Sequence, residues 1–273
     1  MDDRDQLTRL LFDEDVIAHR HLDWRTPLEW LGFPPYFLIE LNGQVESILA
    51  CPPDPPGIAW IRFFSGGKLI PHKEAWNLLW GKVRGFFLGQ TGIQVCAITI
   101  QGWFREILES SNFQSRQKIV MLTWRGSVIP QSDPHPGLNI RKMENADITS
   151  VVEVDRTAFE VIWQNSEQAL RKALAQASVV TVAEMDGRII GYQLSTANLI
   201  GGHLARLAII PEFQGRGIGR VLLSDLIQQF SHNKIQSISV NTQSDNLASL
   251  SLYKKMGFHE TGERFPVYEY EVK

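Results

Sequence analysis

The chain has 273 residues, 44% of them hydrophobic and 21% charged, with a formal net charge of −3 at pH 7; this composition is typical of a well-packed globular protein with room for two domains and excludes a disordered chain. The charge balance also argues against a general nucleic-acid binder, which needs a basic surface. Because the sequence has no run of 18 apolar residues and an acidic start unlike a signal peptide, we expect a cytoplasmic protein with no membrane or nucleic-acid partner.

The first half of the chain contains a series of predicted strands and helices. Asn42-Gly43 is a strong hairpin signal, so 36–50 is expected to form two antiparallel strands. Apolar runs and helical periodicity then predict a strand at 58–65, a helix at 74–89, a strand at 95–100, a helix at 103–111 and a strand at 118–124. The proline-rich stretch 126–137 that follows is typical of a linker.

The second half repeats nearly the same order of elements. We predict a strand at 138–143, helices at 147–159 and 166–177, and a hairpin at 178–196 with Asp186-Gly187 at its turn. These are followed by a strand at 203–210, a helix at 217–230, a strand at 237–243, a helix at 246–256 and a strand at 267–272. The two hairpin turns are 144 residues apart, and so are Arg62 and Arg206. This spacing indicates a tandem duplication of one α/β scaffold whose copies have diverged.

A glycine-rich turn separates the predicted strand and helix of the second half, with glycines at alternate positions: Gly215, Gly217 and Gly219. The first N–H groups of a helix lack partners and its dipole makes that end partly positive, so this arrangement is typical of an anion site. Arg216 and Arg220 would add charge-assisted contacts. The turn matches neither GxxxxGK[ST] nor GxGxxG. A tight turn without a ligand is the alternative.

The wider context of this turn resembles a known family. Residues 214–219 fit Q/R-x-x-G-x-G/A, and Asn246 and the run Tyr253–Phe258 follow. These motifs resemble those of the GNAT superfamily of acyl-CoA-dependent N-acetyltransferases across 138–273. The resemblance implies an α/β fold of two tandem GNAT-like domains, 1–128 and 138–273, each a twisted mixed sheet flanked by helices. It also implies acetyl-CoA as co-substrate and transfer to a primary amine of a small molecule, a protein N-terminus or a lysine.

The resemblance assigns cofactor contacts residue by residue. The backbone of the fourth strand would pair with the pantetheine at Leu207, Ala208 and Ile209. The glycine loop would cradle the pyrophosphate with Gln214, Gly215, Arg216, Gly217, Ile218, Gly219 and Arg220. Asn246 matches an asparagine that contacts the cofactor, and Tyr253 matches a tyrosine beside the CoA sulfur that could protonate the departing thiolate. The alternative for Tyr253 is a half-buried aromatic whose hydroxyl contacts water.

The general base is left open by these motifs. The segment 239–258 resembles that of the protein N-terminal alanine acetyltransferases, which carry a glutamate where this chain has Asn241. Glu184 and His203 are the candidate bases, with ordinary surface positions as the alternative for each. Trp163 could line the acceptor site or anchor the core. Because the glutamate is missing, a non-catalytic acyl-CoA-binding protein is the competing function.

The first half departs from the family pattern. Its corresponding loop, 65–71, lacks Q/R-x-x-G-x-G, and Leu108 falls near the position of the tyrosine, so we expect a degenerate copy that no longer binds CoA in the usual way. Seven of the eight tryptophans lie in this half. They could form a core and interdomain packing or, alternatively, an aromatic acceptor groove.

No metal site is predicted, because His19, His21 and His72 have no ligand-like cluster around them. Cys51 and Cys96 lack CxxC spacing and are expected to be buried free thiols. Two fused copies could pack as a pseudo-dimer, so both a monomer and a homodimer remain open.

Overall fold

A computed structural model describes residues 3–13, 16–126 and 135–272. The chain divides into two compact units. Unit 1 comprises Met1–Gln117 and Phe265–Lys273, and unit 2 comprises Lys118–Arg264. Most of the predicted linker at 126–137 lies outside the described residues.

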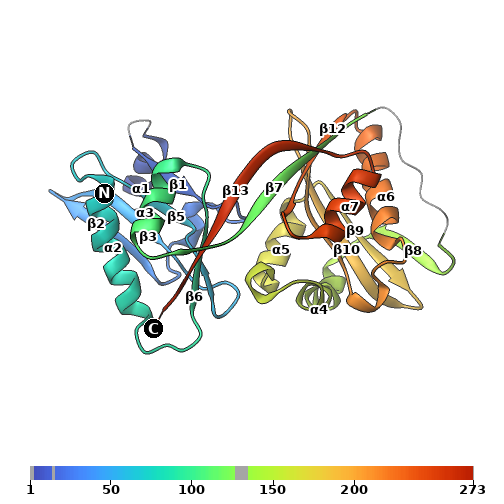
Figure 1. Cartoon of the computed structure of the whole chain (residues 1–273), viewed down its shortest axis with the longest axis horizontal. Helices are drawn as coiled ribbons and strands as arrows, with labels where there is room; N and C mark the ends of the chain where they lie inside the picture. The colour runs from blue at the N-terminus through green and yellow to red at the C-terminus, as the bar shows by residue number, and fades with distance from the viewer. Residues whose placement is uncertain (1–2, 14–15, 127–134, 273) are drawn as a thin grey trace. The chain divides into compact units, whose positions relative to one another are not determined.

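Unit 2 is built on a mixed sheet with the strand order β7-β12-β11-β10-β9-β8 (Figure 1). β11 and β12 run parallel, and the other neighbours run antiparallel. Each strand predicted between residues 118 and 243 is present. The strands are β7 (Gln114–Arg125), β8 (Leu138–Lys142), β9 (Val179–Met185), β10 (Arg188–Ala197), β11 (Gly202–Ile209) and β12 (Ser237–Gln243).

Helices cover both faces of this sheet. α4 (Ile148–Ala158) and α5 (Glu167–Gln176) lie on one face, while α6 (Ile218–His232) and α7 (Leu247–Lys255) lie on the other. The apolar positions of α6 that recur every four residues are buried, as its periodicity predicts: Ile218, Leu222, Leu226 and Phe230. Leu226 and Phe230 pack with side chains of β11 and β12 in one core.

Unit 1 has the same kinds of element. Its strands form the order β1-β5-β3-β2 and the order β4-β6-β13. The strands are β1 (Ala18–Arg20), β2 (Tyr36–Leu41), β3 (Gln44–Ala50), β4 (Ile58–Trp60), β5 (Phe63–Ser65), β6 (Gln94–Ile98) and β13 (His259–Glu271). The helices are α1 (Asp3–Phe12), α2 (His72–Phe87) and α3 (Gly102–Ser110). The elements α1 and β1 have no counterpart among the predictions.

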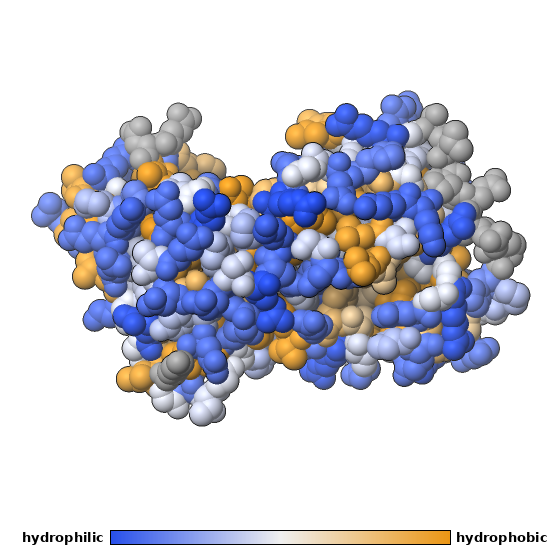
Figure 2. Space-filling view, viewed as in Figure 1, coloured by the Kyte–Doolittle hydropathy of each residue, from blue (hydrophilic) through white to orange (hydrophobic). Residues whose placement is uncertain are grey.

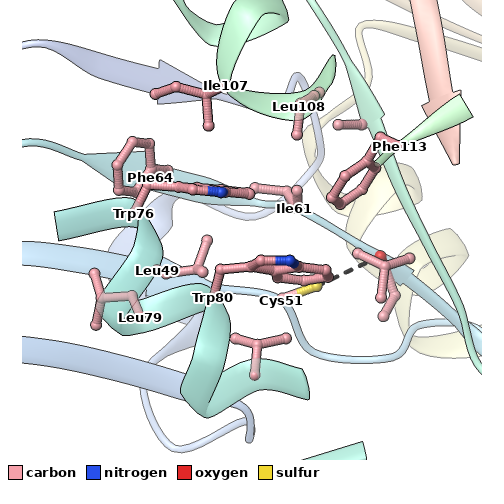
Figure 3. Packing of buried hydrophobic residues seen from close by; sticks show 14 of the residues in the cluster. Leu49, Cys51, Ile61, Phe64, Trp76, Leu79, Trp80, Ile107, Leu108 and Phe113 are labelled. Carbon is pink, nitrogen blue, oxygen red and sulfur yellow. Dashed lines mark hydrogen bonds between the residues drawn. The ribbon is translucent and has the colours of Figure 1, made fainter. Parts of the chain in front are cut away.

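The core of unit 1 is aromatic (Figure 3). Trp76 and Trp80 stack with ring centroids 5.6 Å apart, and both side chains are buried. Cys51 and Cys96 are buried and free, and Cys51 Sγ donates to the Ala59 carbonyl. Burial raises the pKa of the Cys96 thiol to about 12, so it stays protonated at neutral pH. The core interpretation holds for these two tryptophans.

Counterpart elements of the two units begin about 144 residues apart. β3 begins at Gln44 and β10 at Arg188, and the hairpin turns before them have the same left-handed conformation. φ is 52° and 74° at Asn42 and Gly43, and 51° and 76° at Asp186 and Gly187. The duplication predicted from the sequence is therefore present as a repeated scaffold.

One strand of each unit comes from the other half of the sequence. Residues 119–125 of β7 pair with 237–243 of β12 in unit 2. Residues 267–271 of β13 pair with 94–98 of β6 in unit 1. The compact units therefore differ from the predicted spans 1–128 and 138–273, because the last strands of the two copies are exchanged.

The face drawn in Figure 2 is mostly hydrophilic, with apolar residues in separate patches. None of the helices in the described part of the chain combines the length and the apolar character that crossing a bilayer requires. The large apolar side chains gather mainly in the cores of the two units.

Candidate active site

The parallel strands β11 and β12 are paired over only part of their length and separate beyond it. They pair only from Gly202 to Leu204, against 238–240 of β12. Beyond that point β11 stays paired with β10, and β12 stays paired with β7. We call the resulting gap between β11 and β12 the splay. The separation that the family resemblance implies between the fourth and fifth strands is therefore present.

The edge of β11 that faces the splay offers unpaired backbone groups. Ile210 N–H donates to the Ile190 carbonyl of β10. Since donors alternate between the two edges of a strand, the N–H groups of Leu207 and Ile209 point into the splay. Within the described residues, no strand pairs with this edge. An extended ligand could add to it as a strand would.

A β-bulge in β11 decides which side chains lie on which face. Ala205 is an extra residue relative to β10. Because side chains alternate along a strand, the extra residue brings His203 and Arg206 onto the face covered by α4. Leu204 and Leu207 lie on the opposite face and pack in the core that contains α6.

The three glycines of the loop before α6 meet different demands. Gly215 and Gly217 have φ of 74° and 84°, which is the left-handed region that favours glycine. Gly217 is the residue before the first turn of α6, and its carbonyl accepts from the Arg220 N–H. A Cβ on Gly219 would lie 3.2 Å from Leu252 Cδ2, so this glycine lets α6 approach α7.

The side chains of the loop have distinct surroundings. Gln214 Nε2 donates to the Ile209 carbonyl at 2.8 Å, so this amide braces the loop against the end of β11. The Arg216 guanidinium lies 4.9 Å from the centroid of the Phe213 ring. Arg216 and Arg220 are both exposed, and they add positive charge beside the N-terminus of α6. The loop therefore has the conformation and the charge of an anion site.

Asn246 and Tyr253 mark the two ends of α7. Asn246 Oδ1 accepts from the Ser249 N–H at 3.0 Å and caps the helix. The Tyr253 side chain is 5% exposed and lies against Phe258. Burial raises the pKa of the Tyr253 hydroxyl, and no group among the described residues is hydrogen-bonded to it. The Tyr253 hydroxyl is therefore protonated at neutral pH.

The two candidate bases lie in different places. His203 stands on the paired rungs just before the splay opens, and its Nδ1 lies 2.9 Å from Ser239 Oγ. Burial lowers the pKa of His203, so its imidazole is neutral at pH 7 and can accept a proton. Glu184 is on β9, two strands from β11, and its Oε2 accepts from Arg141 Nε at 2.8 Å. It borders a groove of about 440 Å³ beside α4. Only His203 lies next to the splay.

The corresponding gap in unit 1 is filled. The predicted strand 58–65 breaks into two: β4 pairs in parallel with β6, and β5 pairs with β3. The other edge of β5 pairs with β1, with Ala18 opposite Ser65 and Arg20 opposite Phe63. The backbone groups that remain open on β11 are thus occupied on β5. This filling is a physical reason for the expected loss of CoA binding in the first copy.

The histidines of β1 are packed against rings. His19 stacks on Phe104 with centroids 4.0 Å apart, and His21 stacks on Trp60 at 4.9 Å. His72 lies edge-on to Trp103. The described residues contain no group of three or more potential ligands that could hold a metal ion.

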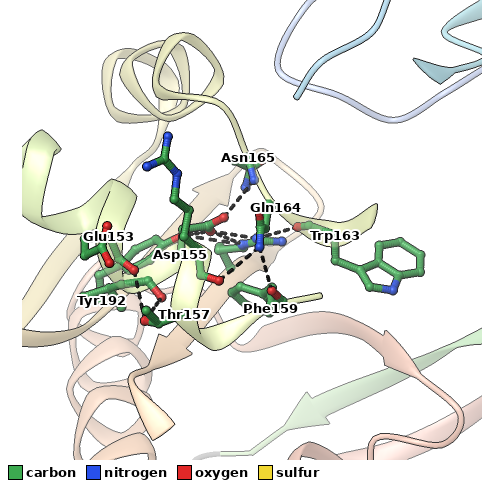
Figure 4. Close-up of polar contacts among 11 residues, drawn as sticks. Glu153, Asp155, Thr157, Phe159, Trp163, Gln164, Asn165 and Tyr192 are labelled. Carbon is green, nitrogen blue, oxygen red and sulfur yellow. Dashed lines mark hydrogen bonds and ion pairs between the residues drawn. The ribbon is translucent and has the colours of Figure 1, made fainter. Parts of the chain in front are cut away.

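Sequence reasoning missed a buried polar network beside the splay (Figure 4). Asp155 of α4 accepts hydrogen bonds from the Tyr192 hydroxyl and from the Arg206 guanidinium. The sequence contains one indication of this network, because Arg206 is a charged residue inside a predicted apolar strand. Its spacing of 144 residues from Arg62 indicates the duplication but assigns Arg206 no role.

Comparisons with known proteins address unit 2 first. Residues 147–268 match the family described as "Acetyltransferase (GNAT) domain". An uncharacterized N-acetyltransferase of Methanocaldococcus jannaschii is 31% identical over 122 residues, which are 44% of this chain and 78% of that protein. The [Ribosomal protein bS18]-alanine N-acetyltransferase of Haemophilus influenzae is 29% identical over 125 residues, 46% of this chain and 84% of that protein.

Solved structures resemble the whole chain. A tandem GNAT protein from the clavulanic acid biosynthesis pathway has a TM-score of 0.62 and 14% identity. Its alignment covers 100% of this chain and 89% of that protein's chain. A GCN5-related N-acetyltransferase from Sphaerobacter thermophilus has a TM-score of 0.61 and 12% identity. Its alignment covers 96% of this chain and 97% of that protein's chain. At these identities the likeness shows the fold, which extends over both units.

Proposed function

This chain belongs to the GNAT acetyltransferase family, and on that premise we propose that unit 2 transfers an acetyl group from acetyl-CoA to a primary amine of a small molecule, a protein N-terminus or a lysine. The observation that carries the proposal is the open edge of β11 next to the glycine loop at the start of α6. The open edge of β11 fits an extended pantetheine chain, and the glycine loop fits a pyrophosphate.

The residues proposed to hold acetyl-CoA come from three elements. The backbone of 207–209 would pair with the pantetheine, and the loop 214–220 would bind the pyrophosphate through its N–H groups and arginines. Asn246 caps α7 with its oxygen, which leaves its Nδ2 to donate to the ligand. When bound, acetyl-CoA supplies a thioester carbonyl that is activated toward an amine.

The catalytic roles proposed follow from protonation states. An amine must lose a proton before it attacks, and neutral His203, hydrogen-bonded to Ser239, can accept that proton directly or through a water. The N–H groups of β11 would stabilise the oxyanion. Tyr253, whose hydroxyl is protonated at neutral pH, would donate its proton to the departing thiolate. Glu184, engaged with Arg141, is the weaker candidate for the base.

Calorimetric titration with acetyl-CoA tests the site. We expect the wild type to bind and Gly217→Glu to lose at least about tenfold in affinity, because the new carboxylate repels the pyrophosphate. Gly187→Glu is the matched control, since Gly187 also has a positive φ, 76°, but lies in the β9–β10 turn. A wild type that does not bind acetyl-CoA would refute the proposed function. Equal affinity in Gly217→Glu would remove the loop from it.

Thiol release over a panel of primary amines tests the chemistry. Turnover should drop about 100-fold or more in Tyr253→Phe and in His203→Gln, the range typical of a lost general acid or base. The panel should pair an N-terminally free peptide with Nα-acetyl-lysine. Strands 118–125, 203–209 and 237–243 contain no Asp or Glu that could hold an ammonium, so the less basic α-amine is expected to react faster.

A second candidate is favoured by Asn241, which cannot act as a base where related enzymes carry a glutamate. A non-catalytic acyl-CoA-binding protein would bind acetyl-CoA without releasing thiol with any amine on the panel. We further propose a cytoplasmic protein that is a monomer or a homodimer. The reduced, buried state of Cys51 and Cys96 is compatible with that compartment.

A further inference from the structure

One stretch of chain adopts opposite positions in the two copies. Residues 17–20 include β1, which fills the gap beside β5 in unit 1. Their counterparts 144 residues later, 161–164, contain a short 3-10 helix, Val161–Trp163. These counterparts form no pairing with β11. The same segment therefore fills the gap in unit 1 and leaves it open in unit 2.

Arg206 and Asp155 hold the segment of unit 2 in place. Arg206 Nη2 donates to the Trp163 carbonyl at 2.6 Å, and Asp155 Oδ1 accepts from the Asn165 N–H at 2.7 Å. The Arg206 guanidinium also lies 3.6 Å from the centroid of the Phe159 ring. These contacts reach the beginning, the middle and the end of the connection between α4 and α5, at Phe159, Trp163 and Asn165, which Figure 4 labels.

The two charged groups are fixed by each other. Arg206 Nε and Nη2 lie 2.9 and 2.7 Å from Asp155 Oδ2, and the Tyr192 hydroxyl donates to the same oxygen. Asp155 is 0% exposed and the Arg206 side chain is 14% exposed. A shielded, multiply bonded pair of this kind permits few alternative rotamers. The position of the connection is therefore set from inside the protein.

Unit 1 retains the arginine and lacks its partners. Arg62 is the counterpart of Arg206, while the counterparts of Asp155 and Tyr192 are Leu11 and Ile48. Arg62 instead pairs with Asp23 at 3.0 Å and donates to the Asp54 carbonyl. The copy in which the gap is filled is thus the copy without the Asp–Tyr pair.

We propose that Arg206, held by Asp155 and Tyr192, is a positioning residue that keeps Val161–Gln164 out of the splay and fixes this segment as a wall on the α4 side. The proposal rests on the proposed function, because it assumes that the open splay is the acetyl-CoA site. Trp163, whose ring points away from the network in Figure 4, would then contribute to that wall.

Hydrogen exchange resolved to single amides, together with acetyl-CoA calorimetry, tests this role in the full chain. Arg206→Met removes the charge and keeps the bulk. We expect amides in 159–166 to lose protection, and the Leu207 and Ile209 amides to gain it as the released segment pairs with β11. If the closed form reaches about 90% of the population, acetyl-CoA affinity falls about tenfold.

Three further variants make the test decisive. Asp155→Asn should reproduce the effect, and Arg206→Lys, which can still pair with Asp155, should restore much of the wild-type behaviour. Arg156→Met, an exposed position on the same helix, should resemble the wild type in both measurements. If Arg206→Met fails to fold, the comparison of Asp155→Asn with Arg156→Met decides.

A purely structural role predicts a different pattern. It would lower protection at Leu207 and Ile209 along with 159–166, and that result would overturn the proposal. Unchanged exchange in 159–166 for Arg206→Met or Asp155→Asn would overturn it as well. A wild type that does not bind acetyl-CoA would refute the proposed function alone, since the exchange pattern reports on the segment independently.

Discussion

At the scale of single residues, the glycine loop shows how one motif can combine separate requirements. Gly215 and Gly217 are needed for their backbone conformation, and Gly219 for the contact between α6 and α7. The sequence pattern identifies the loop but not this division, because φ and the distance to Leu252 are properties of the fold. Mutations at adjacent glycines should therefore have different consequences.

Gly217→Ala should destabilise the protein by about 1 kcal/mol, since an L-residue in the left-handed region costs roughly that much. Gly219→Ala should change the free energy of unfolding by less than about 0.5 kcal/mol. There the helix propensity gained is offset by crowding the flexible end of Leu252. Chemical denaturation of both variants measures the difference. Equal losses would contradict the assignment of conformation to one glycine and packing to the other.

His19 makes the stability of unit 1 depend on pH. Its burial lowers the pKa of the imidazole from 6.5 to about 4. A depressed folded-state pKa gives stability that is complete above pH 6.5 and is lost as the pH falls toward 4. Between pH 7.5 and pH 5 the contribution lost is about 2 kcal/mol.

The measurement is denaturant unfolding of wild type and His19→Leu at the two pH values. The wild type should lose about 2 kcal/mol more than the variant on acidification. His232→Leu, at an exposed position in unit 2, is the control and should keep the wild-type dependence. If His19→Leu keeps it too, the buried imidazole is not its source.

At the scale of elements, the difference between the copies lies in one short strand. β1 has only three residues, yet it occupies the edge of β5 that corresponds to the open edge of β11. Each chain should therefore bind one acetyl-CoA. Calorimetry should give a stoichiometry close to one, and the Gly217→Glu chain should show no second site of similar affinity. Two sites per chain would mean that β1 leaves the gap readily.

Much of the scaffold could be read from the sequence, because hairpin turns and periodic apolar positions are local signals. β9, β10 and α6 all formed close to their predicted bounds. β1 was missed because its three residues carry no alternation, and its pairing with β5 depends on a gap formed by distant strands. The Asp155–Arg206 pair was missed because its members are 51 residues apart and meet only when α4 lies on the sheet.

The site itself was predictable to the extent that its motif is contiguous. The loop at 214–220 follows one strand and begins one helix, so its position is fixed locally. Which of Glu184 and His203 lies beside the splay depends on strand order, which no spacing along the chain reveals. The bulge at Ala205, which sets the face of His203, has no sequence signature.

At the scale of the whole molecule, the exchanged strands make the two halves of the sequence interdependent. Val120, Leu122 and Trp124 of β7 are buried in the core of unit 2, and Tyr268 of β13 is buried in the core of unit 1. Either half expressed alone would lack a strand and expose an apolar edge.

Residues 1–137 and 138–273, produced separately, should therefore be unfolded or aggregated. When produced together in one cell, they should form a soluble complex with the circular dichroism spectrum of the intact chain. Circular dichroism and gel filtration measure both outcomes. A folded, monomeric 138–273 fragment would show that β7 is dispensable to unit 2 and would contradict the interdependence.

The exchange also has a consequence for the order of events during synthesis. Residues 267–271, which complete the sheet of unit 1 beside β6, leave the ribosome only after all of unit 2 has been made. Until then β6 presents an unpaired edge to other nascent chains, which is a known route to misassembly. Unit 2 receives β7 before its own strands emerge, so it can close first. The copy proposed to bind acetyl-CoA would thus mature ahead of the one whose gap is filled.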